Sequence, residues 1–487
     1  MVKRRVKTPK PIRTSRIRIK EEERGNEDIA EQKQVQLDIN NENLEQLTLS
    51  TDLKINLAIL QKALGESDDV IFHEFQIGKD IKLDVAFVFI DGLTDKTIID
   101  QHVLSPLIIE IPKIIDDCWD IGRAGAAEKV KSHFLTVREV KEENYLGNLI
   151  EAFLDGEGVL LIDGCSTALI VGVKGWEHRT VSQPINERNV RGPQESFNEV
   201  LRSGTALIRR RIKDPNLIIK TRAIGSRSKT AVAIIYIKDI INPTLLQEVE
   251  TRLNQIDTDS ILESGYIEQY IEDNPFSPFP QIQYTERPDR VAAALLEGRI
   301  AIMVDGTPNA LIIPAVLSNF WTAVDDYYER WMAANLFRSF RTINILVAVI
   351  LPSLYISITT YHQEMLPTAL AFSVAGARQG LPFPAFVEAI IMEIAIELLR
   401  EAGLRLPGVI GQTIGIVGGI ILGQAAVTAG IVSPLMIVIV ALTAIGSFSI
   451  PSYNAGISLR ILRFPLMILA AMLGLYGIMF GIIIILI

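Results

Sequence analysis

Four glutamates interrupt an apolar segment in the last third of this 487-residue chain: Glu388, Glu393, Glu397 and Glu401, within 388-EAIIMEIAIELLREAG-403. On a helix with about 100° per residue, the last three fall within about 80° of each other with Arg400 at their border, and Glu388 points elsewhere. An ionised group at the centre of a bilayer costs at least ~2.5 kcal/mol, so such a stripe must face protein or water. One interpretation is a water-filled ion passage built from several copies or partners. The other is an interfacial or re-entrant amphipathic helix with solvated carboxylates.

The sequence around this segment has the composition of a membrane domain. Residues 342–487 contain no Lys and no Asp, only five Arg and five Glu. About 20 predominantly apolar residues are needed to span a bilayer. Three segments satisfy this easily and a fourth is just long enough: 342–362, 408–431, 464–487 and 433–451. The acidic segment, from about residue 383, is the candidate fifth span.

The positions of the arginines favour five spans over four. Lys and Arg prefer cytoplasmic loops, and three arginines precede the first span: Arg330, Arg338 and Arg341. If the acidic segment crosses, the later arginines at 400, 405, 460 and 463 also emerge on the inside, and only Arg378 lies outside. If it does not cross, those four lie outside. We therefore predict that the acidic segment is a span.

A glycine ridge lies in the apolar segment 408–431. Its members recur every four residues: Gly411, Gly415, Gly419 and Gly423. Small residues at this spacing let helix backbones approach closely, and Gly477 and Gly481 repeat the theme near the C-terminus. We predict helix packing at this ridge, either within one subunit or between copies.

The preceding residues read as a duplicated α/β subdomain. Aligned from Asp163 on Asp305, GVLLIDGCSTALI and IAIMVDGTPNALI agree at Asp-Gly and at Ala-Leu-Ile, and other segments pair at nearly the same offset. We infer two copies, roughly 51–175 and 195–320. Each Asp-Gly lies between two apolar strands and predicts a hairpin turn. Ligand or metal binding by the two aspartates is the weaker interpretation, because no second carboxylate or His recurs near them.

Two charged regions remain ambiguous. Residues 1–20 hold nine Lys or Arg, and residues 21–50 hold nine Asp or Glu against two basic residues. This is a disordered, self-neutralising tail or a polybasic arm on an anionic leaflet; no motif supports nucleic-acid binding. A second cluster comprises Arg209, Arg210, Arg211 and Lys213. It is either a solvated helix face or a contact for lipid headgroups or an acidic partner.

The sequence contains no constellation typical of catalysis. Phosphate-binding loops, HExxH and recognisable Ser/His/Asp spacing are missing, and the two cysteines are 47 residues apart without a CxxC motif. We therefore expect no enzyme activity, metal or cofactor. Because no apolar segment precedes the soluble half, that half is expected in the cytoplasm.

The predicted architecture is an α+β membrane protein. It consists of a charged tail, two α/β subdomains and a helical transmembrane domain of about five spans, at residues 1–50, 51–190, 191–335 and 336–487.

Several long segments, in this order along the chain, resemble the A subunits of the GerA family of spore nutrient-germinant receptors or their SpoVA-associated paralogue. They are 87-FVFIDGLTDK-96, 378-RQGLPFPAFVEAIIMEIAIELLREAGLRLP-407, 450-IPSYNAGISLRILRFPLM-467 and residues 275–315 and 411–434. The resemblance covers about residue 60 onward. Family members usually continue into a short tail after the last span, and this sequence stops at Ile487.

The resemblance implies a protein of the spore inner membrane that works with a permease-like B subunit and a lipoprotein C subunit. It implies nutrient sensing and ion release, with the A subunit oligomerising into a gated ion conduit. Glu388, Glu393, Glu397 and Glu401 are then candidate ion-path residues. The alternative is a non-conducting scaffold that couples the nutrient-binding partner to other germination proteins.

Overall fold

The computed structural model describes residues 47–78, 83–110, 126–131, 135–137, 139–175, 183–184, 187–405, 418–419 and 421–486. The charged tail up to residue 46 lies outside these ranges. The chain divides into two compact units. The first contains residues up to 61, Ile71–Ile90 and Thr94–Gly175; the second contains Lys62–Val70, Asp91–Leu93 and everything from Trp176. The predicted limits at 190 and 191 stay a prediction.

The first sheet has five strands in the order β1-β2-β4-β5-β3. They are β1 (Val70–Ile77), β2 (Leu83–Ile90), β3 (Val140–Glu143), β4 (Gly158–Ile162) and β5 (Ala168–Val171). The described helices beside them are α2 (Leu53–Leu64), α3 (Lys96–Ile98), π-helical turns over Ile99–Leu104 and Pro106–Glu110, α5 (Ala126–Lys129) and α6 (Leu146–Leu154). Most of residues 96–110 is thus helical, with wider turns than an α-helix.

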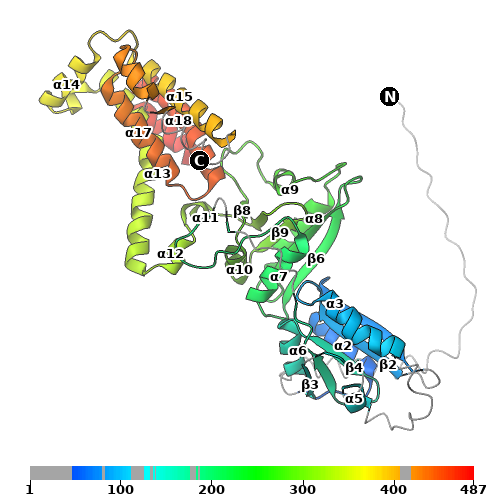
Figure 1. Cartoon of the computed structure of the whole chain (residues 1–487). Helices are drawn as coiled ribbons and strands as arrows, with labels where there is room; N and C mark the ends of the chain where they lie inside the picture. The colour runs from blue at the N-terminus through cyan, green and yellow to red at the C-terminus, as the bar shows by residue number, and fades with distance from the viewer. Residues whose placement is uncertain are drawn as a thin grey trace, which may run out of the picture. The chain divides into compact units, whose positions relative to one another are not determined.

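The second sheet repeats this arrangement in the order β6-β7-β9-β10-β8. Its strands are β6 (Leu217–Ile224), β7 (Thr230–Ile237), β8 (Gln283–Thr285), β9 (Ile300–Val304) and β10 (Ala310–Ile313), and its helices are α7 (Leu201–Arg211), α8 (Pro243–Asn254), α9 (Ser264–Ile271) and α10 (Pro288–Leu296). In both copies a helix comes first, followed by two strands, further helices, one strand, one helix and two strands (Figure 1). The same strand order twice is what a duplicated subdomain would give.

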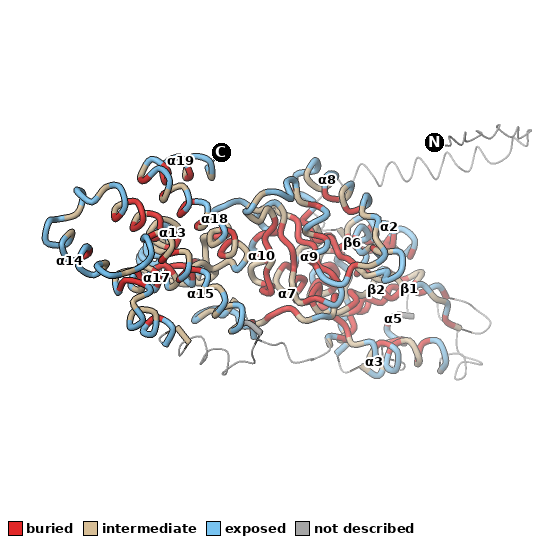
Figure 2. The backbone as a smooth tube through the Cα atoms, turned by 90° about the horizontal axis from the view of Figure 1, so that it is seen from above, coloured by how far each residue is buried: buried red, intermediate tan, exposed pale blue. Residues whose placement is uncertain are grey.

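The inner strand β7 shows why the second sheet is covered on both faces. Successive side chains of a strand point to opposite faces. Ala233, Ile235 and Ile237 pack in one core with residues of α7 and α10. Val232, Ile234 and Tyr236 pack in another with residues of α8 and α9. The run AVAIIYI is apolar throughout because both of its faces are buried. Figure 2 shows the region between the labels α7, α9 and α10 as mostly buried.

Both Asp-Gly pairs form the predicted hairpin turns. β4 pairs antiparallel with β5, and β9 pairs antiparallel with β10. Gly164 and Gly306 have φ values of 83° and 88°, which glycine adopts without steric cost. The hairpin prediction is confirmed at both positions.

The two turn aspartates also cap helices that lie more than 100 residues away in the sequence. Asp163 accepts a hydrogen bond from the Leu53 amide (3.3 Å), and Asp305 accepts one from the Leu201 amide (3.1 Å). These amides begin α2 and α7, where the first turn of a helix has unsatisfied N–H groups and a positive dipole end. The repeated carboxylate therefore has a structural role in both copies.

The basic cluster of α7 is largely neutralised inside the protein. Arg209 is buried and binds Asp69 through two hydrogen bonds of 2.8 and 2.9 Å, with a third to Ser67 (2.8 Å). Arg211 pairs with Glu195 at 2.5 Å, and Arg210 lies 3.6 Å from the same carboxylate. Neither a fully solvated face nor a lipid-binding patch describes this cluster, because its first residue, Arg209, is 2% exposed.

Burial gives Glu268 on α9 an unusual titration. Its pKa is raised to about 7, first by burial and then by the charges of Glu272 and Glu263. A carboxyl whose pKa is raised in the folded state stabilises the fold while it is protonated, and this contribution is lost as the pH rises through the folded-state pKa.

We expect the unfolding temperature of the purified chain to decline as the pH rises from 4.5 to about 7, and Glu268→Gln to reduce that decline. Thermal unfolding followed across this pH range checks the expectation, with Glu74→Gln at an exposed site on β1 as the matched control. An unchanged pH dependence in Glu268→Gln would contradict it.

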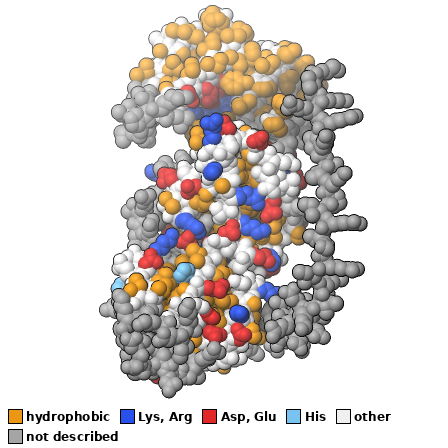
Figure 3. Space-filling model, turned by 90° about the vertical axis from the view of Figure 1, so that its right-hand side faces the viewer, with side chains coloured by type: hydrophobic (Ala, Val, Ile, Leu, Met, Phe, Trp, Pro, Cys, Tyr) orange, Lys and Arg blue, Asp and Glu red, His pale blue; other side chains and the backbone are white. Residues whose placement is uncertain are grey.

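The C-terminal part is a helical bundle. Its helices are α13 (Trp331–Thr360), α14 (Thr368–Arg378), α15 (Ala385–Arg405), α17 (Pro434–Phe448), α18 (Tyr453–Leu473) and α19 (Leu475–Leu486). Two described helices, α13 and α18, are long and apolar enough to cross a membrane by length and composition, and α17 and α19 are apolar but shorter. The predicted count of about five spans is therefore not confirmed. Hydrophobic side chains gather on the bundle surface at the top of Figure 3.

The predicted span over 464–487 is not a single helix. Arg460 and Arg463, expected in a loop before it, both lie inside α18. The helical run instead ends at Gly474, whose φ of 64° starts a fold-back into α19. Gly477 and Gly481 lie against the backbone of Leu469 and the side chain of Leu466, so they pack within one chain.

Candidate functional site

The acidic helix α15 turns its central carboxylate into the bundle. Glu393 is 1% exposed and pairs with Arg463 of α18, which is 3% exposed. Two charges removed from water remain stable only when they are paired closely. The remaining oxygen of Glu393 and the Nε of Arg463 have no hydrogen-bond partner within the described part of the chain.

Glu397, one turn later, meets two arginines. Arg400 lies 3.1 Å from its Oε1, and Arg460 of α18 lies 3.5 Å from the same atom. Arg400 also donates to Ser447 (3.1 Å) and stacks over the Phe448 ring at 5.0 Å. Glu393 and Glu397 both contact α18, as residues on one helix face should.

Glu388 lies apart from this pair, as helix geometry predicts. It is fully buried, and its carboxylate binds Arg378 at the end of α14 (3.2 Å) and the backbone amide of Ser433 (2.9 Å). Ser433 caps α17 by accepting a hydrogen bond from the Met436 amide. A carboxylate beside a helix N-terminus is stabilised by the helix dipole. Glu401 is exposed near the C-terminal end of α15.

The charge count of the α15–α18 cluster differs from what a cation path needs. Two carboxylates, Glu393 and Glu397, face three guanidinium groups, Arg400, Arg460 and Arg463. The cluster therefore has an excess of one positive charge. In this conformation the predicted ion-path carboxylates serve as partners for arginines of the same chain.

The glycine ridge is described only in part. Gly411 and Gly415 lie outside the described residues. A Cβ on Gly423 would touch Ile437 of α17 at ordinary van der Waals distance, and one on Gly419 would meet nothing within 4 Å. Intrachain packing therefore covers one of the two described members of the ridge.

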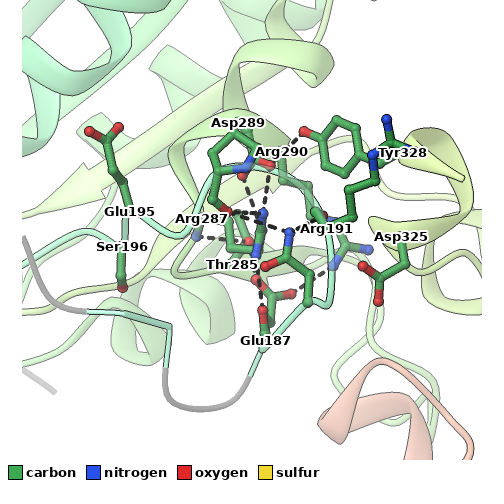
Figure 4. Close-up of polar contacts among 12 residues, drawn as sticks. Glu187, Arg191, Glu195, Ser196, Thr285, Arg287, Asp289, Arg290, Asp325 and Tyr328 are labelled. Carbon is green, nitrogen blue, oxygen red and sulfur yellow. Dashed lines mark hydrogen bonds and ion pairs between the residues drawn. The ribbon is translucent and has the colours of Figure 1, made fainter.

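A second polar cluster ties the loop before α7 to the start of α10 (Figure 4). Arg287 is fully buried. It binds both carboxylate oxygens of Asp289, at 3.1 and 2.7 Å, and the carbonyl oxygens of Glu187 and Pro193, at 3.1 and 2.8 Å. Arg290 binds the Glu187 carboxylate at 2.6 Å. Charged groups therefore hold this part of the loop against α10.

Tyr328 of α12 (Asp325–Tyr328) joins this cluster. Its hydroxyl donates to Asp289 (2.7 Å), and in Figure 4 it points toward that carboxylate. Burial would raise the pKa of Asp289, but hydrogen bonds from Arg287 and Tyr328 outweigh it and hold that pKa below the ordinary value. Burial and the neighbouring Asp289 raise the pKa of Tyr328 to about 12.

The same four-residue helix also binds the first long bundle helix. Asp326 is buried and contacts Arg341 of α13 through two hydrogen bonds of 2.7 and 3.1 Å, and Arg338 at 3.2 Å. Arg341 additionally binds the Trp321 carbonyl (2.9 Å). Helix α12 is thus connected by charged contacts to α10 and to α13; we call these contacts the α12 junction.

The local sequence does not predict the α12 junction. Its central residues belong to 285-TERPDR-290, which lies within the longer segment 275–315 that carries the family resemblance. One local signal was available: Pro288 begins α10, and charged residues surround it where the helix should turn an apolar face to the sheet. The partners Glu187 and Tyr328 are 100 and 39 residues distant from the residues they bind, so no local pattern links them.

Comparison with known proteins places the chain in a family. Residues 58–487 match the family described as Bacillus/Clostridium GerA spore germination protein. Spore germination protein B1 of Bacillus subtilis (strain 168) is 45% identical over 436 residues, which is 89% of this chain and 87% of that protein. An uncharacterized membrane protein, YfkQ, from the same strain is 44% identical over 90% of this chain and 83% of its own length.

The sequence also matches chains of known structure. One match is the crystal structure of the N-terminal domain of the A subunit of the Bacillus megaterium spore germinant receptor GerK3, with 35% identity and a TM-score of 0.43. The match covers 56% of this chain and 98% of that one. With a family match that extends over residues 58–487 and relatives at 44–45% identity, this chain belongs to the GerA family of spore germination proteins.

Proposed function

We propose that this chain is the A subunit of a spore germinant receptor and that it transduces nutrient binding into ion release. Its GerA family membership supports this role, as do relatives named spore germination proteins. The apolar helices α13 and α18 support a place in the spore inner membrane, with the α/β subdomains on the cytoplasmic side. The partners would be a permease-like B subunit and a lipoprotein C subunit.

We propose further that several copies oligomerise into a gated ion conduit. The observation that carries this proposal is the burial of ionisable side chains in an apolar bundle: Glu388 and Glu393 are 0% and 1% exposed. Charged residues inside membrane domains are costly and rare, and where they occur they mark ion pathways and proton relays. Because both carboxylates have arginine partners, conduction requires a second conformation in which those ion pairs open.

The pairing also supports a second candidate function. If the ion pairs persist in every state, the glutamates serve only to hold α15 against α18 and α14. The chain would then be a non-conducting scaffold that passes a signal from the nutrient-binding partner through the α12 junction. The two functions differ in whether neutralising a carboxylate changes ion flow.

Glu397 is the residue for this test because it is 31% exposed and its removal leaves no fully buried charge alone. We expect Glu397→Gln to slow nutrient-triggered ion release from spores while the receptor complex assembles normally. Removing a carboxylate that cations pass takes away the attraction that concentrates them there. Cation release after nutrient addition is measured together with receptor abundance in the spore membrane.

Glu364→Gln is the matched control, because Glu364 is exposed and lies outside α15. Normal release in assembled Glu397→Gln receptors would contradict a role of this carboxylate in the conduit and favour the scaffold. Slow release in both variants would indicate a general loss of function.

A further inference from the structure

Helix α13 is longer than a membrane span requires. It contains 30 residues, and at 1.5 Å per residue this is about 45 Å, against a hydrocarbon core of about 30 Å. Sequence hydropathy predicts that the span starts at residue 342, eleven residues after the helix begins. This first third must therefore lie against another surface or in water.

The two faces of this first third differ sharply. One face carries Arg338 and Arg341, which bind Asp326 of α12. The other face is apolar and exposed. At about 100° per residue, Met332, Leu336, Phe340 and Ile343 fall within about 80° of one another. Their exposed fractions, and those of two neighbours, are large: Met332 66%, Leu336 53%, Phe340 55%, Ile343 54%, Phe337 54% and Trp331 71%.

This apolar face continues into the span without a break. Leu346, which lies inside the predicted span, is 53% exposed and follows Ile343 on the same side of the helix. By the same geometry, Trp331 lies about 20° from Arg338 and not on this face. At 1.5 Å per residue, Phe340 and Leu336 lie about 3 and 9 Å before the start of the span. This places Phe340 in the headgroup layer of the lipid that surrounds the span, and Leu336 at the outer edge of that layer.

We propose that the exposed face formed by Leu336, Phe340 and Ile343 is a lipid-binding surface that lies in the headgroup region of the membrane. The nearby charges of Asp325, Asp326 and Glu329 balance those of Arg330, Arg338 and Arg341, so the surface recognises the apolar-polar boundary of the bilayer and not anionic lipid in particular. The α12 junction then lies at the membrane surface. This inference rests on the membrane location proposed above.

The test uses the full chain in phosphatidylcholine vesicles with Phe340→Trp supplying the only tryptophan. The four natural tryptophans, Trp119, Trp176, Trp321 and Trp331, are replaced by Phe. Fluorescence is measured with phosphatidylcholine that carries a spin label either near the headgroup or deep in the acyl chain, and with iodide in the water. We expect the shallow label to remove most of the emission of the Phe340→Trp variant, and the deep label and iodide to remove little.

A second variant, Leu346→Trp in the same tryptophan-free background, separates the two proposals. Quenching of this tryptophan by the deep label with no lipid quenching in the Phe340→Trp variant would overturn the lipid-binding surface alone. In that case, protection of the Phe340→Trp variant from iodide would identify a protein partner on this face, and quenching by iodide would place the face in water. No lipid quenching in either variant would overturn the membrane location itself.

Discussion

Replacing Arg463 with leucine is expected to destabilise the helical bundle strongly. The substitution leaves the Glu393 carboxylate at 1% exposure without its partner. Removing one member of a buried ion pair costs about 3–5 kcal/mol, because the remaining charge is neither hydrated nor neutralised. The midpoint of thermal unfolding of the purified full chain, and its abundance in membranes, measure this loss.

Two further variants separate charge from packing. The double swap Glu393→Arg with Arg463→Glu restores an ion pair across the same helices, so it should recover much of the stability that Arg463→Leu loses. Arg460→Leu is the matched control, because Glu397 keeps Arg400 as a partner at 3.1 Å, and it should change stability little. A chain with Arg463→Leu that is as stable as the unchanged chain would contradict a structural ion pair between α15 and α18.

This ion pair also shows what helix periodicity can and cannot predict. The spacing of Glu393 and Glu397 placed them on one face of a helix, and both contact α18. Their partners on α18 are 70 and 63 positions further along the chain, and nothing in a local pattern connects residues at that separation. Arg400, three positions after Glu397, is a local partner, and the spacing placed it at the border of the acidic face. Arg460 and Arg463 lie inside α18, where the preference of Lys and Arg for cytoplasmic loops does not apply.

The same distinction holds in the α/β subdomains. The Asp-Gly turns were predictable because the glycine requirement is local to the turn. The capping of Leu201 by Asp305, 104 residues away, was not predictable from either segment. Arg209 is the clearest case: in a run of basic residues it resembled a solvated charge, and its partner Asp69 is 140 residues away. Tertiary contacts decide which member of a charge cluster is buried.

Replacing Arg287 with alanine is expected to loosen the α12 junction without unfolding the sheets. Arg287 is fully buried and binds Asp289 and the carbonyls of Glu187 and Pro193. Its loss leaves the largely buried Asp289 carboxylate with the Tyr328 hydroxyl as its remaining hydrogen-bond donor among the described residues. This costs about 3–5 kcal/mol by the same reasoning as for other buried pairs. Arg287→Lys should recover part of this loss, because it keeps a positive charge beside Asp289. The recovery should be incomplete, because an ammonium group cannot make the paired contacts of a guanidinium.

Hydrogen–deuterium exchange of the full chain locates the effect. In Arg287→Ala, amides of residues 187–196 and of α12 should exchange faster, whereas amides of β2 and β4 in the first sheet should not change. Arg191→Ala, at an exposed position of the same loop, serves as the control and should leave exchange as it is. Uniform acceleration over both sheets would indicate global destabilisation and contradict a local junction.

The extent of that change decides whether α12 can transmit a signal. Tyr328 and Asp326 are two residues apart on one short helix, and they bind Asp289 and Arg341 respectively. If α12 moves as a unit, releasing Tyr328 from its anchor should also weaken the contact of Asp326 with α13. Faster exchange should then appear at the start of α13, where Arg338 and Arg341 are held. Acceleration that stops at Tyr328 would mean that the two halves of the junction are independent, and the signal would need another route into the bundle.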